Sequence, residues 1–408
     1  MRVLVIGTNR VCHDRLRDQG HEMVLFVPRG RVRREDPVGP YSHVVILDDE
    51  AGADLWAETA EVLHRRYPFD AVAAYNEHTY PLVRAVSERL GIPTAVDVEL
   101  FHRVVDKSRM RRILDEHAIP SCRFVLARGR RAVLDAVEEI GLPCIVKPVD
   151  TEGSLGVSRI DAARDIEAAL RRVGPHHIDR GVVVEEFLDG DEFSVEALST
   201  GGRHRIIAVT RKFTDPVTFV SRGHVIPAPL TTDEHAAVTA YVTRVLDAFG
   251  FHDCPSHTEV MLTEHGPRII EMHNRIGGDA IMDLVHLSTG VDMYDLVARQ
   301  SIGEDISVLL PDEVTHERSA AAWYAAPSGS PAHTLLKVEG VERVRGLPHV
   351  RGVTLLKEPG SPQPVVRNNF DRSGRVLAVG DSPEQALDHA REATAVLRFV
   401  YGWSSPDV

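Results

Sequence analysis

Short apolar runs alternate with amphipathic segments over the first hundred residues, and this alternation restricts the fold more than any other feature of the chain. The first run, Arg2-Val-Leu-Val-Ile-Gly7, is rich in β-branched residues and ends in glycine. Such a run is typical of a buried parallel strand that ends at a ligand-facing turn. The same reasoning predicts strands over residues 23–27, 42–47 and 70–75, and helices over residues 55–67 and 80–90. The pattern therefore predicts a doubly wound α/β domain.

The positions of later motifs divide the chain into three parts. Its 408 residues are enough for two or three domains of roughly 150 residues each. A basic helix over residues 107–117 opens the second part, which holds a glycine-bearing loop at residues 150–157. The third part is predicted to contain strands over residues 193–198, 205–209, 257–262 and 267–272, and helices over residues 280–287, 293–300 and 383–399. We expect domains at residues 1–105, 106–186 and 187–408.

Several classes of function are disfavoured by the sequence. A nicotinamide fingerprint would need Gly-x-Gly-x-x-Gly after the first strand, whereas the chain has Gly7-Thr-Asn-Arg-Val-Cys12. The four cysteines lack the spacing of a zinc site. A net charge of −13 opposes binding of nucleic acid, and no stretch has the length and apolar character of a membrane span. We therefore expect a cytoplasmic protein with no nucleic-acid or membrane partner.

A lysine followed by a small-residue loop forms the first candidate site. Lys147 stands near the end of the run Pro143-Cys-Ile-Val-Lys-Pro148, and the loop Glu152-Gly-Ser-Leu-Gly156 follows. This order can place an ammonium group and several backbone N–H groups around a polyphosphate. It is not a Walker loop, because the lysine precedes the glycines. The alternative is a strand-end lysine beside an ordinary turn.

An acidic turn joins two predicted strands within residues 182–196. Backbone groups of residues 185–188 could contact the edge of an adenine, and Glu192 could accept hydrogen bonds from both hydroxyl groups of a ribose. The alternative, which is the commoner fate of such charges, is a solvated hairpin rim.

Two glutamates on adjacent predicted strands form the third candidate site. Glu259 follows His257, and Glu271 opens the run Glu271-Met-His-Asn-Arg-Ile-Gly-Gly-Asp279. A tight turn joins the strands, so both carboxylates can lie on one face, where they would repel each other without a cation. Beside a polyphosphate such a pair is suited to Mg²⁺, and Arg275 adds a planar group suited to carboxylate or phosphoryl oxygens. The alternative places the two carboxylates on opposite faces, each solvated.

Taken in order, these motifs resemble the ATP-grasp superfamily, and in particular its L-amino acid ligases, which join two unprotected amino acids into a dipeptide. The resemblance spans nearly the whole chain and includes Asp106-Lys-Ser-Arg-Met110 and the tail Gly374-Arg-Val-Leu-Ala-Val-Gly380. It implies an α/β, ATP-grasp fold with an N-terminal doubly wound domain, a small lid domain and a larger C-terminal α+β domain. It also implies an enzyme that forms an amide bond between two amino acids through an acyl phosphate, at the expense of ATP.

The resemblance further implies roles for particular residues. The nucleotide would be held by Lys107, Lys147, Ser154, Gly156, Glu185, Glu186, Phe187, Leu188, Glu192 and Lys212, with the loop of residues 152–156 closing over the phosphates. Glu259, Glu271 and Asn274 would hold Mg²⁺. Two ions are expected, and Mn²⁺ could replace Mg²⁺. Catalysis would fall to Arg275, Lys147 and His224, and the amino acids would be bound by His224, Arg275, Gly277, Gly278 and Asp279. Independently of the resemblance, Glu77 stands at the end of a predicted strand, where ligands of open α/β sheets bind, and is a further candidate for substrate binding from the first domain.

Two positions leave alternatives open. Many ATP-grasp enzymes have asparagine two residues beyond the second metal-binding carboxylate, whereas this chain has His273 there and Asn274 next. Histidine suits Mg²⁺ poorly, so either Asn274 takes that place through a local bulge or Glu271 acts without this help. Asp279 could favour a cationic or hydrogen-bonding side chain on the first amino acid, or it could be the N-cap of a helix that begins at Ala280.

Two other functions are compatible with the same motifs. The first is an ATP-grasp ligase that acts on formate, bicarbonate or a nucleotide precursor; it would usually need a further phosphate-binding motif for the acceptor, and the sequence shows none. The second is a non-catalytic ATP-binding protein, which we would expect to lack a metal carboxylate or Arg275, yet all three are present. The expected partners are small amino acids, and a homodimer is also compatible with the sequence.

Overall fold

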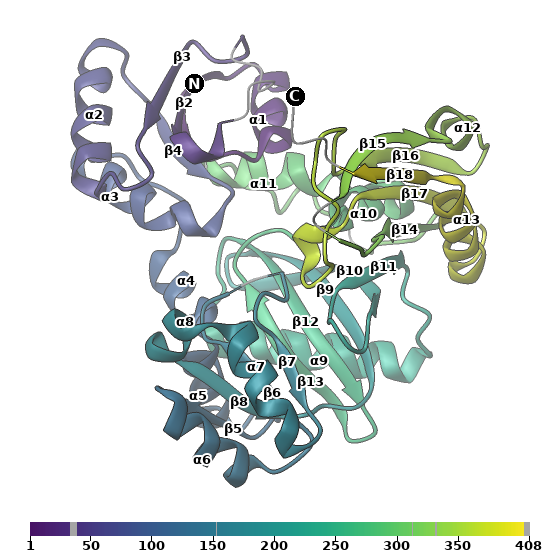
Figure 1. The fold of residues 1–408 in the computed structure, drawn as a ribbon. Coiled ribbons are helices and arrows are strands. Elements are labelled where there is room, and N and C mark those ends of the chain that lie inside the picture. Colours follow the sequence, from purple (N-terminus) through teal and green to yellow (C-terminus); the bar gives the residue numbers. More distant parts are fainter. Residues whose placement is uncertain (33–38, 152, 312, 331–332, 404–408) are drawn as a thin grey trace.

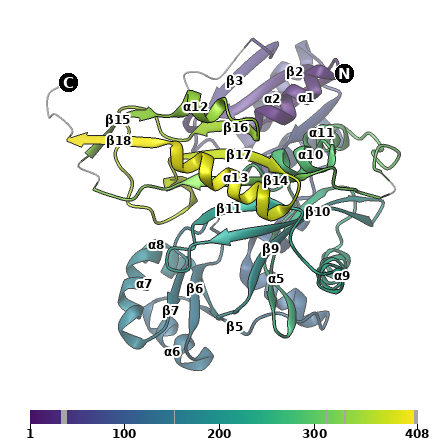
Figure 2. The same ribbon diagram turned by 90° about the vertical axis from the view of Figure 1, so that its right-hand side faces the viewer.

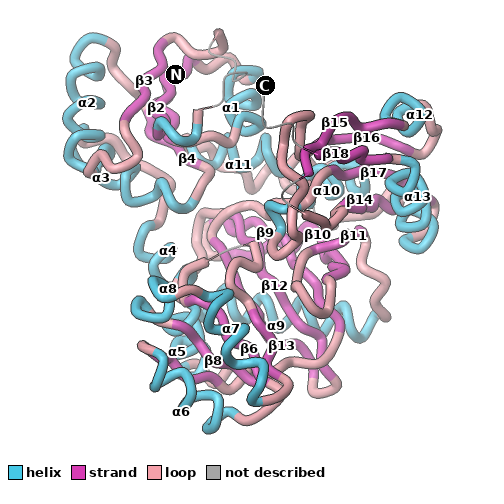
Figure 3. Tube along the Cα trace, in the orientation of Figure 1, coloured by secondary structure: helices cyan, strands magenta, loops and turns pink. Residues whose placement is uncertain are grey.

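The computed structural model describes residues 1–32, 39–151, 153–311, 313–330 and 333–403. These residues form four β-sheets with their covering helices (Figures 1 and 3). In Figure 1 the purple N-terminal part lies at the upper left, the yellow-green C-terminal part at the right, and the second part at the lower left. Among the helices of the described residues, none has the length and apolar character needed to span a bilayer.

The N-terminal part is a four-stranded parallel sheet with strand order β3-β2-β1-β4, which confirms the strands predicted here. Its elements are β1 (Arg2–Ile6), α1 (Arg10–Asp18), β2 (Glu22–Pro28), η1 (Arg29–Arg31), β3 (His43–Leu47), α2 (Ala53–Arg66), β4 (Ala71–Ala74), η2 (Glu77–Thr79), α3 (Tyr80–Leu90) and α4 (Val98–Val105). Successive residues of β1 enter different core clusters, because strand side chains alternate between faces. Helix α1 packs on one face together with α11 (Met293–Ser301) of the third part, so this sheet is joined to the rest of the molecule by a shared core.

The second part is a four-stranded antiparallel sheet with order β5-β8-β6-β7. Its elements are α5 (Lys107–Glu116), β5 (Phe124–Ala127), α6 (Arg130–Ile140), β6 (Cys144–Pro148), β7 (Ser158–Ile160), η3 (Ala163–Asp165), α7 (Ile166–Val173), α8 (Pro175–Arg180) and β8 (Val182–Glu186). Helix α5 begins after Asp106, whose carboxylate accepts hydrogen bonds from the backbone N–H groups of Ser108 and Arg109. This cap fixes the start of the helix that carries Lys107.

The third part is built on an eight-stranded antiparallel sheet with order β13-β12-β9-β10-β11-β14-β17-β16. Its elements are β9 (Asp191–Thr200), β10 (Arg203–Thr214), β11 (Ser221–Ile226), α9 (Thr232–Phe249), β12 (Pro255–Thr263), β13 (Gly266–His273), α10 (Ile281–Thr289), α11, β14 (Ser319–Ala325), β15 (His333–Glu339), α12 (Val341–Arg345), β16 (Val350–Leu355), η4 (Asn369–Asp371), β17 (Gly374–Gly380), α13 (Pro383–Val396) and β18 (Arg398–Trp403). Strands from the C-terminal extension continue the same sheet beyond β11, as Figure 2 shows. The exact domain boundaries remain predictions.

The predicted final helix over residues 383–399 is wrong at its end. Helix α13 ends at Val396, and β18 follows and pairs antiparallel with β15. Leu397 already has an extended backbone, with φ −71° and ψ 121°. The sequence Arg-Phe-Val-Tyr-Gly-Trp of β18 is aromatic and β-branched, which favours a strand. Pairing with β15 therefore outweighs the helical pattern of the apolar residues.

Candidate active site

Two adjoining cavities contain most of the residues that the sequence nominated. The first, of about 940 Å³, is lined by Lys107, Lys147 and Lys212, and we call it the lysine cleft. The second, of about 1910 Å³, is lined by Arg275, Arg372 and Arg375, and we call it the arginine pocket. Residues that line both are Gly153, Lys212, Ser221, Glu259, Glu271 and Asn369. The two cavities therefore meet at the predicted metal-binding glutamates.

The three lysines of the lysine cleft are buried, and each contacts a glutamate. The pairs are Lys147 Nζ with Glu185 Oε2 at 2.8 Å, Lys107 Nζ with Glu271 Oε2 at 3.3 Å, and Lys212 Nζ with Glu259 Oε1. A buried ammonium group needs a compensating charge, and here the carboxylates supply it. Phosphate oxygens carry the same charge as these carboxylates, so a polyphosphate in the cleft can take over the lysine contacts.

The loop between β6 and β7 closes over one side of the lysine cleft. The hydroxyl of Ser154 donates to the carbonyl of Phe219 at 2.7 Å, and the backbone N–H of Asn369 donates to the carbonyl of Gly153 at 3.1 Å. Ser154 lines the cleft, whereas Gly156 lines neither cavity. A Cβ on Gly156 would lie 3.0 Å from Pro148 Cγ at a positive φ, so glycine is needed for the turn itself. Glu152, which opens the predicted loop, lies outside the described residues.

Residues 185–188 and Glu192 line the lysine cleft, but all three of their carboxylates already have partners, Glu186 with Arg123 at 3.0 Å. Glu185 lies between Lys147 and Arg111, whose Nε is 3.0 Å from its Oε1. Burial raises the pKa of Glu185, but the two cations outweigh it and lower the pKa to about 2. Glu192 contacts Lys212 at 2.6 Å and accepts a hydrogen bond from the hydroxyl of Thr214. The Glu185 carboxylate is therefore not available to a base, and the backbone N–H groups of Glu186 and Phe187 already donate to the carbonyls of Arg123 and Pro143.

Glu259 and Glu271 are direct partners in the β12–β13 ladder, which confirms the prediction that they lie opposite each other. Burial raises the pKa of Glu259, but Lys212 outweighs it and lowers the pKa to about 2. Lys107 likewise holds the pKa of Glu271 well below its usual range. Two ionised carboxylates fit Mg²⁺, which typically binds through one or two carboxylates plus phosphate oxygens and water. Within the described ranges there is no group of three or more His, Cys, Asp or Glu side chains that could hold a metal ion by itself.

His257, two residues before Glu259, connects this glutamate to a second buried carboxylate. Its Nδ1 lies 2.7 Å from Glu196 Oε1, and its Nε2 lies 3.4 Å from Glu259 Oε1. Burial lowers the pKa of His257, but Glu196 and Glu259 outweigh it and raise the pKa to about 9. The imidazole is therefore charged near neutral pH and can donate a hydrogen bond to each carboxylate.

His273, two residues after Glu271, has the same relation to Glu77 of the N-terminal part. Its Nδ1 lies 2.9 Å from Glu77 Oε1, and its Nε2 lies 3.4 Å from Glu271 Oε1. Glu77 is buried and also lies 3.5 Å from Arg275 Nε. Burial raises the pKa of Glu77, but His273 and Arg275 lower it to about 2. Glu77 does line the arginine pocket, but its carboxylate is already held by these two cations.

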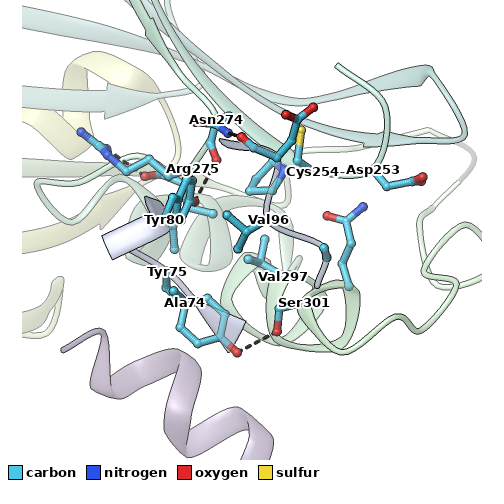
Figure 4. A pocket seen from close by; sticks show the side chains of 15 residues that line it. Ala74, Tyr75, Tyr80, Val96, Asp253, Cys254, Asn274, Arg275, Val297 and Ser301 are labelled. Carbon is cyan, nitrogen blue, oxygen red and sulfur yellow. Dashed lines mark hydrogen bonds between the residues drawn. The ribbon is translucent and has the colours of Figure 1, made fainter. Parts of the chain in front are cut away.

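Asn274 is not brought to the metal-facing glutamates. It lines a separate cavity of about 450 Å³, together with Tyr80 and Val96 (Figure 4). Its side-chain amide donates to the carbonyl of Asp97, and its own carbonyl accepts a hydrogen bond from the Tyr80 hydroxyl. The β12–β13 ladder has a register shift just before Glu271, but its pairing is regular from Glu271 to His273. No bulge therefore turns Asn274 toward Glu271, and the His273 side chain lies next to Glu271 instead. The geometry gives no support to Asn274 as a metal ligand.

Asp279 and Arg372 form a buried ion pair at one wall of the arginine pocket. Arg372 Nη1 donates to Asp279 Oδ2 at 2.9 Å, Nη2 donates to Oδ1, and the guanidinium lies 3.9 Å above the ring of Tyr324. Burial raises the pKa of Asp279, but His224 and Arg372 hold it well below its usual range. The N-cap of α10 is Ala280, which makes no side-chain cap, so Asp279 does not act as that cap. Its carboxylate is also not free to select a cationic substrate.

His224 is fully buried and lines the same pocket. Its Nε2 lies 3.7 Å from Asp279 Oδ2. Burial lowers the pKa of His224, and Asp279 offsets this only in part. The imidazole is therefore neutral near neutral pH and can accept a proton.

Gly277 and Gly278, which both line the arginine pocket, differ in how closely their surroundings approach. A Cβ on Gly277 would lie 2.8 Å from Glu196 Oε2 and 2.9 Å from His257 Nδ1, whereas one on Gly278 would meet nothing within 4 Å. The backbone of Gly277 thus packs directly on the Glu196–His257 pair.

Some residues of the site were missed in the sequence. Arg111 lies four residues after Lys107 on α5, and this helical spacing could have identified it. Glu196 is a lone carboxylate in an apolar strand, which is also a usable signal. Asn369 and Arg372 lie in an irregular segment of the extension, and no local pattern marks them.

Comparison with known families places two domains on the chain. Residues 140–283 match a family model described as an ATP-grasp domain, and residues 330–402 match one described as L-amino acid ligase C-terminal domain 2. The first match covers the glycine loop, His224 and both metal-facing glutamates. The second covers Asn369 and Arg372.

The chain is also similar to individual proteins. It is 30% identical over 330 residues to protein y4rH of Sinorhizobium fredii, covering 79% of this chain and 66% of that protein. It is 25% identical over 254 residues to alanine–anticapsin ligase of Bacillus subtilis, covering 57% of this chain and 53% of the relative. A crystal structure of an L-amino acid ligase from Bacillus licheniformis superposes with a TM-score of 0.85 at 24% identity, covering 98% of both chains. The chain thus spans about two thirds and about half of the lengths of the two curated relatives.

Proposed function

This chain belongs to the ATP-grasp superfamily of ligases, and from that premise we propose that it joins two amino acids through an acyl phosphate, with release of ADP and phosphate. The observation that carries this proposal is that the lysine cleft and the arginine pocket meet at Glu259 and Glu271. ATP in the cleft would present its γ-phosphate at this junction. A carboxylate substrate in the pocket would face it from the other side.

In the first step, a carboxylate oxygen of the first amino acid attacks the γ-phosphorus, an O–P bond forms, and the bond to the β-phosphate oxygen breaks to release ADP. Lys107 and Lys212, which now contact Glu271 and Glu259, are placed to turn toward the phosphates and stabilise the transferred charge. Arg275, which lines the arginine pocket, is suited to orient the attacking carboxylate. Glu259 and Glu271 would hold Mg²⁺, which would supply neutralisation of the phosphate charge.

In the second step, the amine of the second amino acid attacks the acyl carbon, the C–N bond forms, and phosphate leaves. The attacking nitrogen must lose a proton, and His224, which lines the pocket, is the candidate acceptor, with Asp279 3.7 Å away to stabilise the imidazolium that forms. The loop with Gly153 and Ser154 closes over the junction and limits the access of water, which would hydrolyse the acyl phosphate.

Amino-acid substrates are supported over the other small carboxylates. The relatives include proteins named alanine–anticapsin ligase and L-amino acid ligase, and the C-terminal family match is to a domain of L-amino acid ligases. The arginine pocket is extended by that C-terminal domain through Arg372 and Asn369. Glu259 and Glu271 line both cavities and Arg275 lines the arginine pocket, and this supports a catalytic protein over a non-catalytic ATP-binding one.

A substrate screen tests this proposal. Purified protein is incubated with ATP, Mg²⁺ and pairs of amino acids, phosphate release is measured, and products are identified by mass spectrometry. Because Asp279 is paired with Arg372, the screen covers acidic, polar and apolar first residues as well as basic ones. We expect phosphate release with at least one pair, together with the dipeptide mass. Release only with single carboxylic acids plus ammonia or bicarbonate would contradict the proposal.

A further inference from the structure

Four titratable side chains lie in a row beside the two metal-facing glutamates. Glu196, His257 and His273 are successive cross-strand neighbours on β9, β12 and β13, and Glu77 follows next to His273. We call these four residues the Glu–His row. The two imidazole rings stack with centroids 6.0 Å apart and planes 21° apart. All four side chains are nearly excluded from solvent.

The row crosses the boundary between two parts of the molecule. Strand β13 is the edge of the eight-stranded sheet, so in the part of the chain that the structure describes no further strand lies beyond His273. Glu77, from η2 of the N-terminal part, occupies that place and pairs with His273 as Glu196 pairs with His257. The N-terminal part thus completes a row that the sheet alone leaves unfinished.

Each histidine of the row also faces a metal-binding glutamate. The Nε2 atoms of His257 and His273 both lie 3.4 Å from one carboxylate oxygen, of Glu259 and Glu271 respectively. Rotation of a glutamate carboxylate about its last bond is only weakly restricted. A hydrogen bond from an imidazole that is itself held by another carboxylate limits this rotation. The second oxygen of the glutamate then faces the junction of the two cavities.

We propose that the Glu–His row positions Glu259 and Glu271 for binding a divalent cation, and that Glu77 makes this binding depend on the N-terminal part. The inference rests on the proposed function, because it takes the two glutamates as the cation site. In this arrangement Glu77 acts on the cation through His273 and Glu271 rather than by contact with substrate. Outer hydrogen-bonding partners of metal ligands typically change metal affinity by roughly 10- to 100-fold.

Binding of Mn²⁺ in the presence of ADP tests this inference without turnover. Free Mn²⁺ is followed by electron paramagnetic resonance, and nucleotide affinity is measured separately by calorimetry in EDTA. We expect E77A to weaken Mn²⁺ binding to the ADP complex by roughly 10- to 100-fold. E77Q should have a smaller effect, because its amide oxygen can still accept a hydrogen bond from His273. E196Q should act in the same direction through His257. Nucleotide affinity in EDTA should stay unchanged in all three variants.

A matched control breaks a different contact between the same two parts. Arg15 of α1 pairs with Asp292, which caps α11, with a distance of 2.7 Å between Nε and Oδ2. R15Q should leave Mn²⁺ affinity unchanged. Thermal unfolding establishes that each variant is folded.

Several outcomes would overturn the inference. Wild-type Mn²⁺ affinity in E77A would do so, as would an equal loss in R15Q, because the effect would then come from general loosening of the two parts. A parallel loss of nucleotide affinity in EDTA would also point to a purely structural role. If the wild-type protein binds no Mn²⁺ with ADP, the metal assignment in the proposed function fails as well. If the wild-type binds Mn²⁺ and E77A does not, while no amino-acid pair reacts, the positioning role stands and the proposed substrates fall.

Discussion

The lysine cleft and the arginine pocket meet at the same two glutamates but are built in different ways. In the cleft, each cation contacts a carboxylate that a phosphate can replace, as Lys107 does with Glu271. In the pocket, Asp279 and Arg372 form a bidentate ion pair, and the Arg372 guanidinium packs on the ring of Tyr324. The cleft is therefore arranged to exchange its ionic partners when nucleotide binds. The pocket is arranged to keep its ion pair and so to keep its shape.

The two cavities also differ in where their residues come from. The charged residues of the lysine cleft lie between Lys107 and Glu271, within the second part and the first half of the third. The arginine pocket draws on all three parts, from Glu77 to Arg372 and Arg375. The family matches do not divide along the same line. Residues 140–283 include Lys147 of the cleft and Arg275 of the pocket, whereas Lys107 of the cleft lies outside both matches.

The largest effect is expected from loss of a carboxylate at the junction. E271Q should lower phosphate release by roughly 100- to 1000-fold with every substrate pair, the size typical for loss of one preorganised electrostatic contact. The neutral amide can no longer neutralise Lys107 or hold a divalent cation. Phosphate release is measured at saturating Mg²⁺, and thermal unfolding checks the fold. The substitution acts on a residue that both cavities share, so it should slow the first chemical step.

A control for E271Q lies on the same hairpin. Glu264 is exposed in the turn between β12 and β13 and contacts only the exposed His265 among the ion pairs of the described residues. E264Q removes the same charge without touching either cavity, and its turnover should equal that of the wild type. Normal turnover in E271Q would contradict the metal assignment.

The sequence predicts more of the lysine cleft than of the arginine pocket, because the pocket is built from more distant segments. The short turn that joins β12 and β13 is local information, but it would by itself place Ile270 opposite Glu259, and a register shift between Glu259 and Val260 is needed to bring Glu271 there. Asp279 and Arg372 are 93 residues apart in the sequence, and no local pattern near Arg372 identifies Asp279 as its partner. For a related reason, the sequence did not decide whether His273 or Asn274 would lie beside Glu271. Which of them faces the cavity depends on how regularly β13 continues, and that is set by pairing with β12 and by Glu77 from the N-terminal part.

The second effect in size concerns the ion pair of the arginine pocket. R372Q leaves Asp279 without its main cation, and breaking such a buried pair costs about 3 kcal/mol. If the pair maintains the shape of the pocket, kcat/KM for the amino acid should fall by up to roughly 100-fold. The KM for ATP should stay unchanged, because Arg372 does not line the lysine cleft. Steady-state kinetics with each substrate varied in turn measures the two effects.

Arg398 supplies the control for R372Q. It lies on β18 in the same C-terminal extension, is exposed, and is 3.7 Å from Glu339. R398Q removes an arginine of the extension far from the pair with Asp279 and should leave both KM values unchanged. An equal rise of the KM for ATP and for the amino acid in R372Q would show that the two cavities are not built independently.

The smallest effect tests how separate the two cavities are at their closest approach. Gly277 lines the arginine pocket, yet its backbone packs on Glu196 and His257, which stand behind Glu259 of the shared junction. In G277A the new methyl group would lie 2.8 Å from Glu196 Oε2, so the pair must shift, at a cost of about 1–3 kcal/mol in folding stability. G278A, whose methyl group meets nothing within 4 Å, should leave the melting temperature unchanged.

The shift in G277A is transmitted through His257. The substitution should therefore raise the Mg²⁺ concentration needed for half-maximal turnover several-fold, which is less than the roughly 10- to 100-fold change typical for loss of an outer partner of a metal ligand. A change in the KM for the amino acid alone, with an unaltered Mg²⁺ requirement, would show instead that the pocket loop and the cation site respond separately.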